Sequence, residues 1–82
     1  MTRVVKIDKR LSNGRLAEYI LDIREINGET VCSIEISVDS EASSVYDVCR
    51  DTDGARKILQ MLADGEAEPC HLQDIIYDML PL

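Results

Sequence analysis

One cluster of side chains near the C-terminus has residue types and a spacing that suit metal binding or proton transfer. His71, Asp74 and Asp78 are three and four residues apart, so they share one face if residues 70–80 form a helix. Cys70 precedes them, near the expected start of that helix. One imidazole with two carboxylates can bind a divalent metal or a small ligand, or move a proton. Acids beside a histidine on an exposed helix more often form a solvated surface, where such pairs contribute little.

The rest of the chain carries no enzyme motif. Residues 51–54 (DTDG) resemble part of a calcium loop, but aligning them with that motif places Cys49 first and Gln60 last, so the bidentate acid is missing. A helix cap explains this segment better. The glycines are scattered singly, and a single histidine without a nucleophile elbow does not suggest a catalytic triad. We therefore predict a protein that is not an enzyme and has no catalytic, cofactor-binding or metal residues. The candidate interaction surface is formed by Cys70, His71, Asp74 and Asp78.

Length and composition predict one small soluble domain over residues 1–82. A single core suffices without disulfides or metals from roughly 70–80 residues upward. Sixteen acidic and nine basic residues give a net charge of −7, which disfavours nucleic acid and anionic lipid as partners. No apolar run approaches the roughly 18–20 residues that span a bilayer, and no targeting segment is recognisable. Three cysteines without a CxxC pair indicate reduced thiols, so we expect a cytoplasmic protein.

The charge is distributed unevenly. Residues 1–15 contain five basic residues and one acid, a net charge of +4, whereas residues 16–82 contain four basic and fifteen acidic residues, a net charge of −11. Pairing of charges across neighbouring strands is one explanation. The alternative is that a basic strand at a sheet edge recruits an acidic partner.

A β-hairpin over residues 16–38 is the strongest structural signal. Two runs of alternating apolar residues flank Asn27-Gly28, a dipeptide typical of two-residue hairpin turns. This turn places Leu21 opposite Ile34 and Tyr19 opposite Ile36 on one face. The opposite face carries mostly polar residues, so we expect one face of the ribbon to pack on the core and the other to meet water.

The first strand, predicted over residues 3–11, has two alternative registers. A three-residue loop ending in Gly14 pairs Val5 with Leu21 and Ile7 with Tyr19. A shift by two residues instead places Lys6 opposite Asp22 and Arg10 opposite Glu18, which suits the charges better. Both registers keep Val5 and Ile7 on the core face.

The second half predicts one more strand and two helices. Residues 39–44 are polar and indicate an exposed connection, and residues 45–49 form a short strand with Tyr46 and Val48 on the same side. Apolar stripes predict helices over residues 53–64 and 70–80. The expected fold is α+β: a four-stranded antiparallel meander with strands at 3–11, 16–26, 29–38 and 45–49, followed by two short helices that cover one face of the sheet. The predicted core comprises Val5, Ile7, Tyr19, Leu21, Ile23, Ile34, Ile36, Leu59, Leu62, Leu72, Ile75, Ile76 and Met79.

Residues 32–36 (CSIEI), 45–49 (VYDVC) and 69–80 (PCHLQDIIYDML) together resemble a family of small uncharacterised proteins from clostridia and related Firmicutes. The closing helix of that family reads Pro-x-His-Leu-x-Asp-Val-Val-x-Asp-Phe-Leu. The matching positions here are Pro69, His71, Leu72, Asp74 and Asp78. The match departs from the family where Cys32-Ser33 replaces Tyr-Gly and Met79 replaces Phe. The family has no assigned function, and the resemblance implies a cytoplasmic bacterial protein.

Two functions are compatible with these observations. The first is a non-catalytic protein-interaction or regulatory module, in which a free sheet edge binds a protein partner or a second copy of the chain. The second is a small-ligand or divalent-metal site at the start of the last helix.

Overall fold

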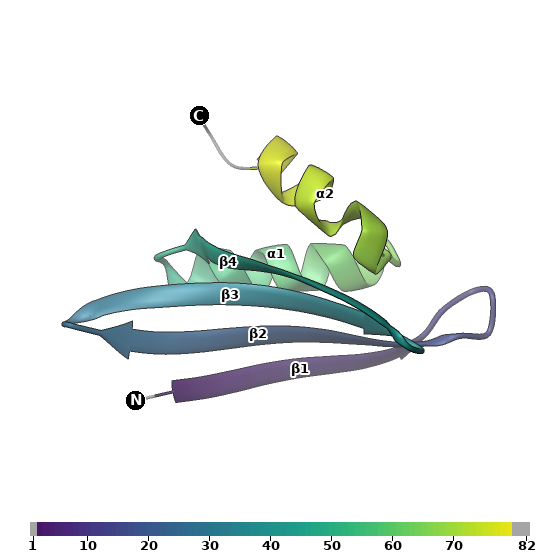
Figure 1. The fold of residues 1–82 in the computed structure, drawn as a ribbon, viewed down its shortest axis with the longest axis horizontal. Coiled ribbons are helices and arrows are strands. Elements are labelled where there is room, and N and C mark those ends of the chain that lie inside the picture. Colours follow the sequence, from purple (N-terminus) through teal and green to yellow (C-terminus); the bar gives the residue numbers. More distant parts are fainter. Residues whose placement is uncertain (1, 80–82) are drawn as a thin grey trace.

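Four antiparallel strands form one open sheet, and two helices pack on one of its faces (Figure 1). The computed structural model describes residues 2–79, with the side chains of Cys49 and Met79 outside the description. The strands are β1 (Thr2–Arg10), β2 (Leu16–Ile26), β3 (Glu29–Val38) and β4 (Glu41–Cys49), in the spatial order β1-β2-β3-β4. The predicted α+β class and antiparallel meander are therefore confirmed.

The β2–β3 hairpin has the predicted turn and register. Asn27 and Gly28 both adopt positive φ, at 52° and 79°, as a type I′ turn requires. Tyr19 lies opposite Ile36, and Leu21 lies opposite Ile34. The side chains of Tyr19, Leu21, Ile34 and Ile36 are all completely buried, so this hairpin supplies the centre of the core.

Turn chemistry decides the register between β1 and β2. Val5 pairs with Leu21, and Lys6 lies opposite Ile20 rather than Asp22, so the register suggested by the charges is wrong. Gly14 has a φ of 87°, and the amide of Leu11 donates to the carbonyl of Arg15 at 2.8 Å, which closes the loop. Since both registers bury the same apolar face, the loop geometry selects between them.

Strand β4 differs from the prediction in its start and its regularity. It begins at Glu41 because Asp39, with a φ of 53°, and Ser40 form a tight turn directly after β3. Asp47 also has a positive φ, 55°, and the register shifts between the pairs made by Cys32 and Ile34, which marks a β-bulge. The bulge breaks the alternation of side chains. Tyr46 is therefore 79% exposed while Val48 is 3% exposed, and the prediction that they share a side is wrong.

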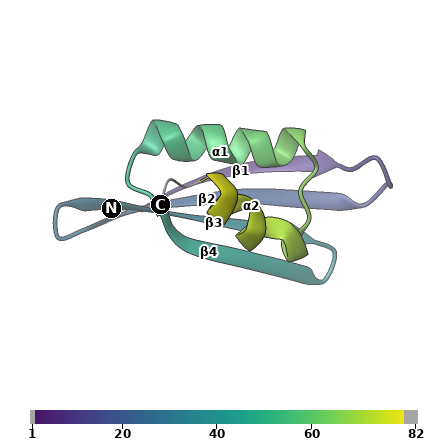
Figure 2. The same ribbon diagram turned by 90° about the horizontal axis from the view of Figure 1, so that it is seen from above.

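Both helices lie on the same face of the sheet, as expected. Helix α1 (Thr52–Asp64) contacts β2, β3 and β4, and helix α2 (Leu72–Met79) contacts β4 (Figure 2). The Asp51 side chain caps α1 by accepting from the amides of Asp53 and Gly54 at 3.3 and 3.2 Å. A 3-10 turn, η1 (Pro69–His71), precedes α2, so the predicted helix over 70–80 begins later than expected, and its last residue lies outside the described residues. Within residues 2–79, neither helix has the length and apolar character needed to cross a membrane.

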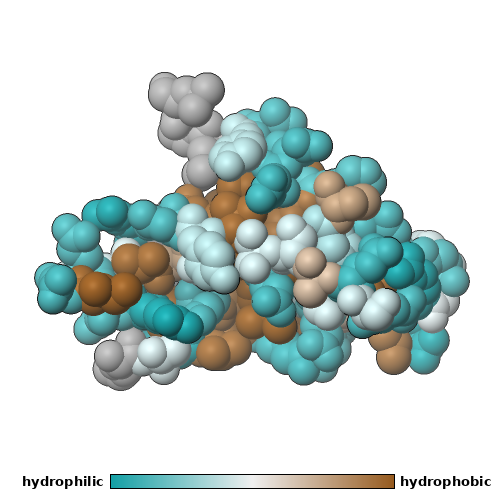
Figure 3. Space-filling model, viewed as in Figure 1, coloured by the Kyte–Doolittle hydropathy of each residue, from teal (hydrophilic) through white to brown (hydrophobic). Residues whose placement is uncertain are grey.

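The core lies between the helices and the covered face of the sheet, and apolar residues are visible in the middle of the space-filling view (Figure 3). Val5, Ile7 and Ile75 are only partly buried and pack against the core edge, while the predicted Met79 side chain lies outside the description. The buried residues are Leu11, Ala17, Tyr19, Leu21, Ile23, Cys32, Ile34, Ile36, Val38, Val48, Ala55, Leu59, Leu62, Ala63, Ala67, Leu72 and Ile76.

Candidate functional site

The C-terminal residues with chemical potential lie on the segment that joins α1 to α2. Pro69 is buried, and Leu72 and Ile76 are fully buried, so one side of η1 and α2 is held against the core. Cys70 and His71 lie on the exposed side of this segment. The apolar stripe of the helix therefore determines which polar side chains reach solvent.

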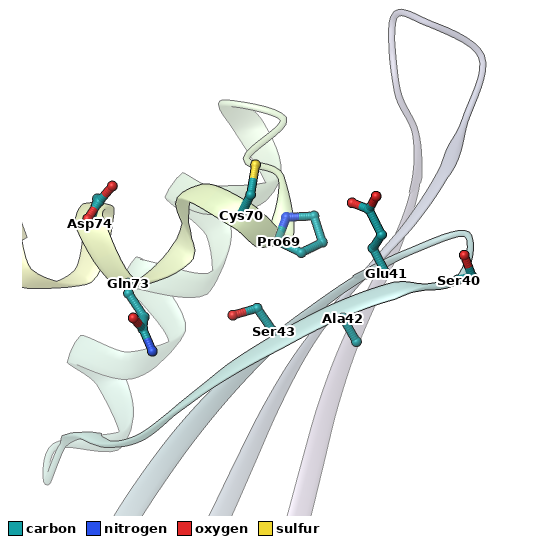
Figure 4. A pocket seen from close by; sticks show the side chains of 8 residues that line it. All are labelled: Ser40, Glu41, Ala42, Ser43, Pro69, Cys70, Gln73 and Asp74. Carbon is teal, nitrogen blue, oxygen red and sulfur yellow. The ribbon is translucent and has the colours of Figure 1, made fainter.

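The structure divides the four predicted site residues between two cavities. His71, Asp74 and Asp78 line a cavity of about 410 Å³ between the end of α1 and α2. Cys70 lines a second cavity, of about 560 Å³, between β4 and the η1–α2 segment. In Figure 4, the Cys70 and Asp74 side chains point away from β4, whereas Gln73 points the other way. Asp74 lines both cavities, so it lies on the ridge that separates them.

A tighter cluster includes a residue that the sequence analysis did not select. The ligand atoms of Glu68, Cys70 and His71 all lie within 4.8 Å of one another. Among residues 2–79, no comparable trio includes Asp74 or Asp78. The spacing of three residues between Glu68 and His71 was the available signal, but only residues of the predicted helix over 70–80 were selected from the sequence.

A hydrogen-bonded clasp holds the connection after α1 against the β1–β2 loop. The Ser12 amide and hydroxyl each donate to one carboxylate oxygen of Glu66, both at 2.7 Å. Both bonds lower the pKa of Glu66 below its ordinary value because they stabilise the charged carboxylate, and the bond from the backbone amide of Ser12 has the larger effect. The two residues are 54 positions apart in the sequence, so the clasp joins distant parts of the chain.

A buried tyrosine of the sheet anchors the connection between α1 and η1 from the side of the core. The Tyr19 hydroxyl donates to the carbonyl of Ala67 at 3.0 Å, and the Tyr19 side chain is completely buried. Burial raises the pKa of Tyr19, and the nearby charges of Glu66 and Glu68 raise it further. The bonds from Ser12 to Glu66 and from Tyr19 to Ala67 together determine the position of Glu68, which directly follows Ala67.

The basic residues of β1 lack acidic partners for the most part. The Lys6 ammonium lies 3.6 Å from a carboxylate oxygen of Asp8 and 3.4 Å from one of Glu18. Both carboxylates raise the pKa of Lys6, and the charge of Asp8 makes the largest single contribution. No ion pair within residues 2–79 includes Arg3, Lys9 or Arg10. Cross-strand pairing therefore explains only part of the charge asymmetry.

Comparisons with known proteins identify no relative of this chain. No family model matches it, and no curated protein or solved structure is significantly similar to it. The resemblance of residues 32–36, 45–49 and 69–80 to the clostridial family therefore stays a prediction.

Proposed function

We propose that this protein is a non-catalytic interaction module whose strand β1 binds an acidic, extended segment of a partner protein by strand addition. The observation that carries the proposal is the outer edge of β1, a nine-residue strand at one end of the sheet, with which no other strand within residues 2–79 pairs (Figure 1). A free edge presents backbone donors and acceptors on which another strand can pair.

The charge of β1 selects the chemistry of the partner. The strand carries four basic residues and one acid, on a chain whose net charge is −7. Lys9 donates to the carbonyl of Ala63, and its charge also helps to lower the pKa of Glu66, so it is partly compensated. Arg3 and Arg10 make no ion pair within residues 2–79, so an acidic strand would meet their positive charges along this edge.

The same charge argues against pairing between two copies of the chain. Two β1 strands side by side would bring eight basic residues together, twice the four of a single strand, and like charges across a ladder are destabilising. Edge lysines are a common protection against indiscriminate sheet extension. The other edge, β4, carries the Asp47 bulge, which interrupts regular pairing there.

The proposal is tested with an acidic peptide that alternates Glu with Val. We expect the peptide to perturb the β1 amide resonances and slow their hydrogen exchange, with affinity that falls as salt rises. Arg3→Glu should weaken binding roughly threefold to tenfold, as expected for loss and reversal of one surface charge. Arg56→Glu, a reversal of an exposed charge on α1, is the matched control and should leave binding unchanged.

A second peptide separates strand addition from simple charge attraction. Replacing every Val by Pro keeps the charge but removes half of the backbone donors and prevents regular pairing. Equal binding of the two peptides, or an equal effect of Arg3→Glu and Arg56→Glu, would contradict the proposal.

A further inference from the structure

The backbone between α1 and α2 brings three potential metal ligands to one point. Glu68 has extended backbone angles, Pro69 follows it, and the His71 amide donates to the Glu68 carbonyl at 3.0 Å, which closes a single 3-10 turn. Glu68 directly precedes the turn, and this bond brings the start of the turn close to its end, so the Glu68 carboxylate and the His71 imidazole lie near each other. Cys70 lies between them, and all three ligand atoms fall within 4.8 Å of one another.

This turn is held rigidly at both ends. Before it, the Ala67 carbonyl accepts from the buried Tyr19 hydroxyl, and the Ala67 amide donates to the Leu62 carbonyl at 3.0 Å. Within and after it, Pro69 and Leu72 are buried in the core. Ligands presented by a fixed backbone lose little conformational entropy on binding, which favours affinity.

We propose that Glu68, Cys70 and His71 bind one zinc ion, with water in the fourth position. A thiolate, an imidazole and a carboxylate form a mixed donor set that suits zinc, whereas magnesium and calcium prefer oxygen ligands alone. Metal–ligand distances of roughly 2.0–2.3 Å place tetrahedral ligands roughly 3.3–3.8 Å apart, so atoms within 4.8 Å of one another need to approach by at most about 1.5 Å. Cys70 and His71 are exposed, and their side chains can rotate by this amount without disturbing the core.

The neighbouring charges leave Glu68 available as a ligand. Its carboxylate lies 3.9 Å from a guanidinium nitrogen of Arg15, but Arg15 makes its shorter bond, 2.8 Å, to Asp39. Glu68 can therefore turn to a metal while Arg15 keeps an acidic partner. Glu66 is bound by Ser12 and stays in the clasp.

The position of the cluster also leaves room for a fourth ligand. Glu68 and His71 line the 410 Å³ cavity, and the Cys70 side chain, which points away from β4 in Figure 4, is exposed. A metal held by all three would therefore lie at the protein surface beside this cavity, where a water molecule can complete the coordination.

Cobalt and zinc titrations of the full chain test the site. Cobalt should bind one ion per chain and give a thiolate-to-metal charge-transfer band with the visible bands of tetrahedral coordination, and zinc should displace it. Cys70→Ser, with Cys32 and Cys49 retained, should abolish the charge-transfer band. Glu68→Gln and His71→Gln should each weaken zinc binding more than about tenfold, since loss of even an indirect supporting contact costs about that much.

Two control variants distinguish this site from the helix face predicted from the sequence. Asp74→Asn and Asp78→Asn remove carboxylates near His71 that are not in the trio, and they should change zinc affinity less than about twofold. All substituted side chains are at least partly exposed, so unchanged urea midpoints without metal are expected and verify folding. A charge-transfer band that persists in Cys70→Ser, or a loss in Asp78→Asn equal to that in Glu68→Gln, would overturn the proposal.

Discussion

Replacing Tyr19 by Phe should destabilise the fold by about 1–3 kcal/mol. The ring of Tyr19 is completely buried and stays in place, so no cavity opens. The change removes only the hydroxyl that donates to the Ala67 carbonyl at 3.0 Å. A typical hydrogen bond contributes about 0.5–1.5 kcal/mol net, and a buried acceptor that loses its donor costs about 1–3 kcal/mol.

Urea unfolding followed by circular dichroism measures this effect, with Tyr46→Phe as the matched control. Tyr46 is 79% exposed, so its hydroxyl is hydrated in the folded and unfolded states, and its loss should cost less than about 0.5 kcal/mol. The slope of the free energy of unfolding against urea should be the same in all three proteins. A difference between the two variants below about 0.5 kcal/mol would refute the view that Tyr19 anchors residues 66–68.

Three further changes probe other parts of the fold. Leu21→Ala should cost about 2–5 kcal/mol in urea unfolding because Leu21 is completely buried, whereas Ile26→Ala, at a side chain that is 52% exposed, should cost about 1 kcal/mol or less. Asp51→Ala should lower the free energy of unfolding by about 0.5–2 kcal/mol because the cap of α1 is lost. Asp53→Ala, in the first turn of the same helix, should lower it less, and a larger loss for Asp53→Ala than for Asp51→Ala would contradict the capping geometry. Since the pKa of Glu66 is lowered from 4.5, the clasp stabilises the fold fully above about pH 4.5 and is lost as the pH falls through the folded-state value. Urea midpoints between about pH 6 and pH 3 should therefore fall further in the wild type than in Glu66→Gln, and parallel curves would contradict this.

The hairpins were predictable because their signals are local. Asn27-Gly28 specifies a turn by itself, and alternation on both sides then determines the pairing of Leu21 with Ile34. Gly14 specifies the second turn in the same way, and the competing charges on Lys6 and Asp22 contribute too little at a surface to overrule it.

The start of β4 was not predictable from alternation. Residues 41–44 (EASS) are exposed or half-buried, and three of them line the cavity beside Pro69, so no apolar alternation marks this part of the strand. Asp47 is an ordinary polar residue in sequence, and its positive φ depends on packing that places Val48 inside.

Two of the three residues of the proposed metal site, Cys70 and His71, were selected from the sequence as part of a candidate interaction surface. Cys70 and His71 attracted attention because of their chemistry, but helical spacing directed the search forward, to Asp74 and Asp78. The neighbour in the structure, Glu68, precedes them in the sequence: it lies just before the 3-10 turn that starts at Pro69, and its carboxylate is within 4.8 Å of the ligand atoms of Cys70 and His71. In this chain, Pro69 lies one residue after Glu68 and two before His71, and that order accompanies the arrangement.

The meander order of the strands bears on how quickly the chain can fold. Each strand pairs with its neighbour in sequence, and the three connections contain five, two and two residues, so the sheet can form by successive short hairpins. Low sequence separation between partners favours rapid folding. The contacts from Tyr19 to Ala67 and from Ser12 to Glu66 close loops of 48 and 54 residues, so we expect them to form late, when the helices dock on the sheet. Changes in residues 66–72 should accordingly accelerate unfolding and leave the folding rate nearly constant.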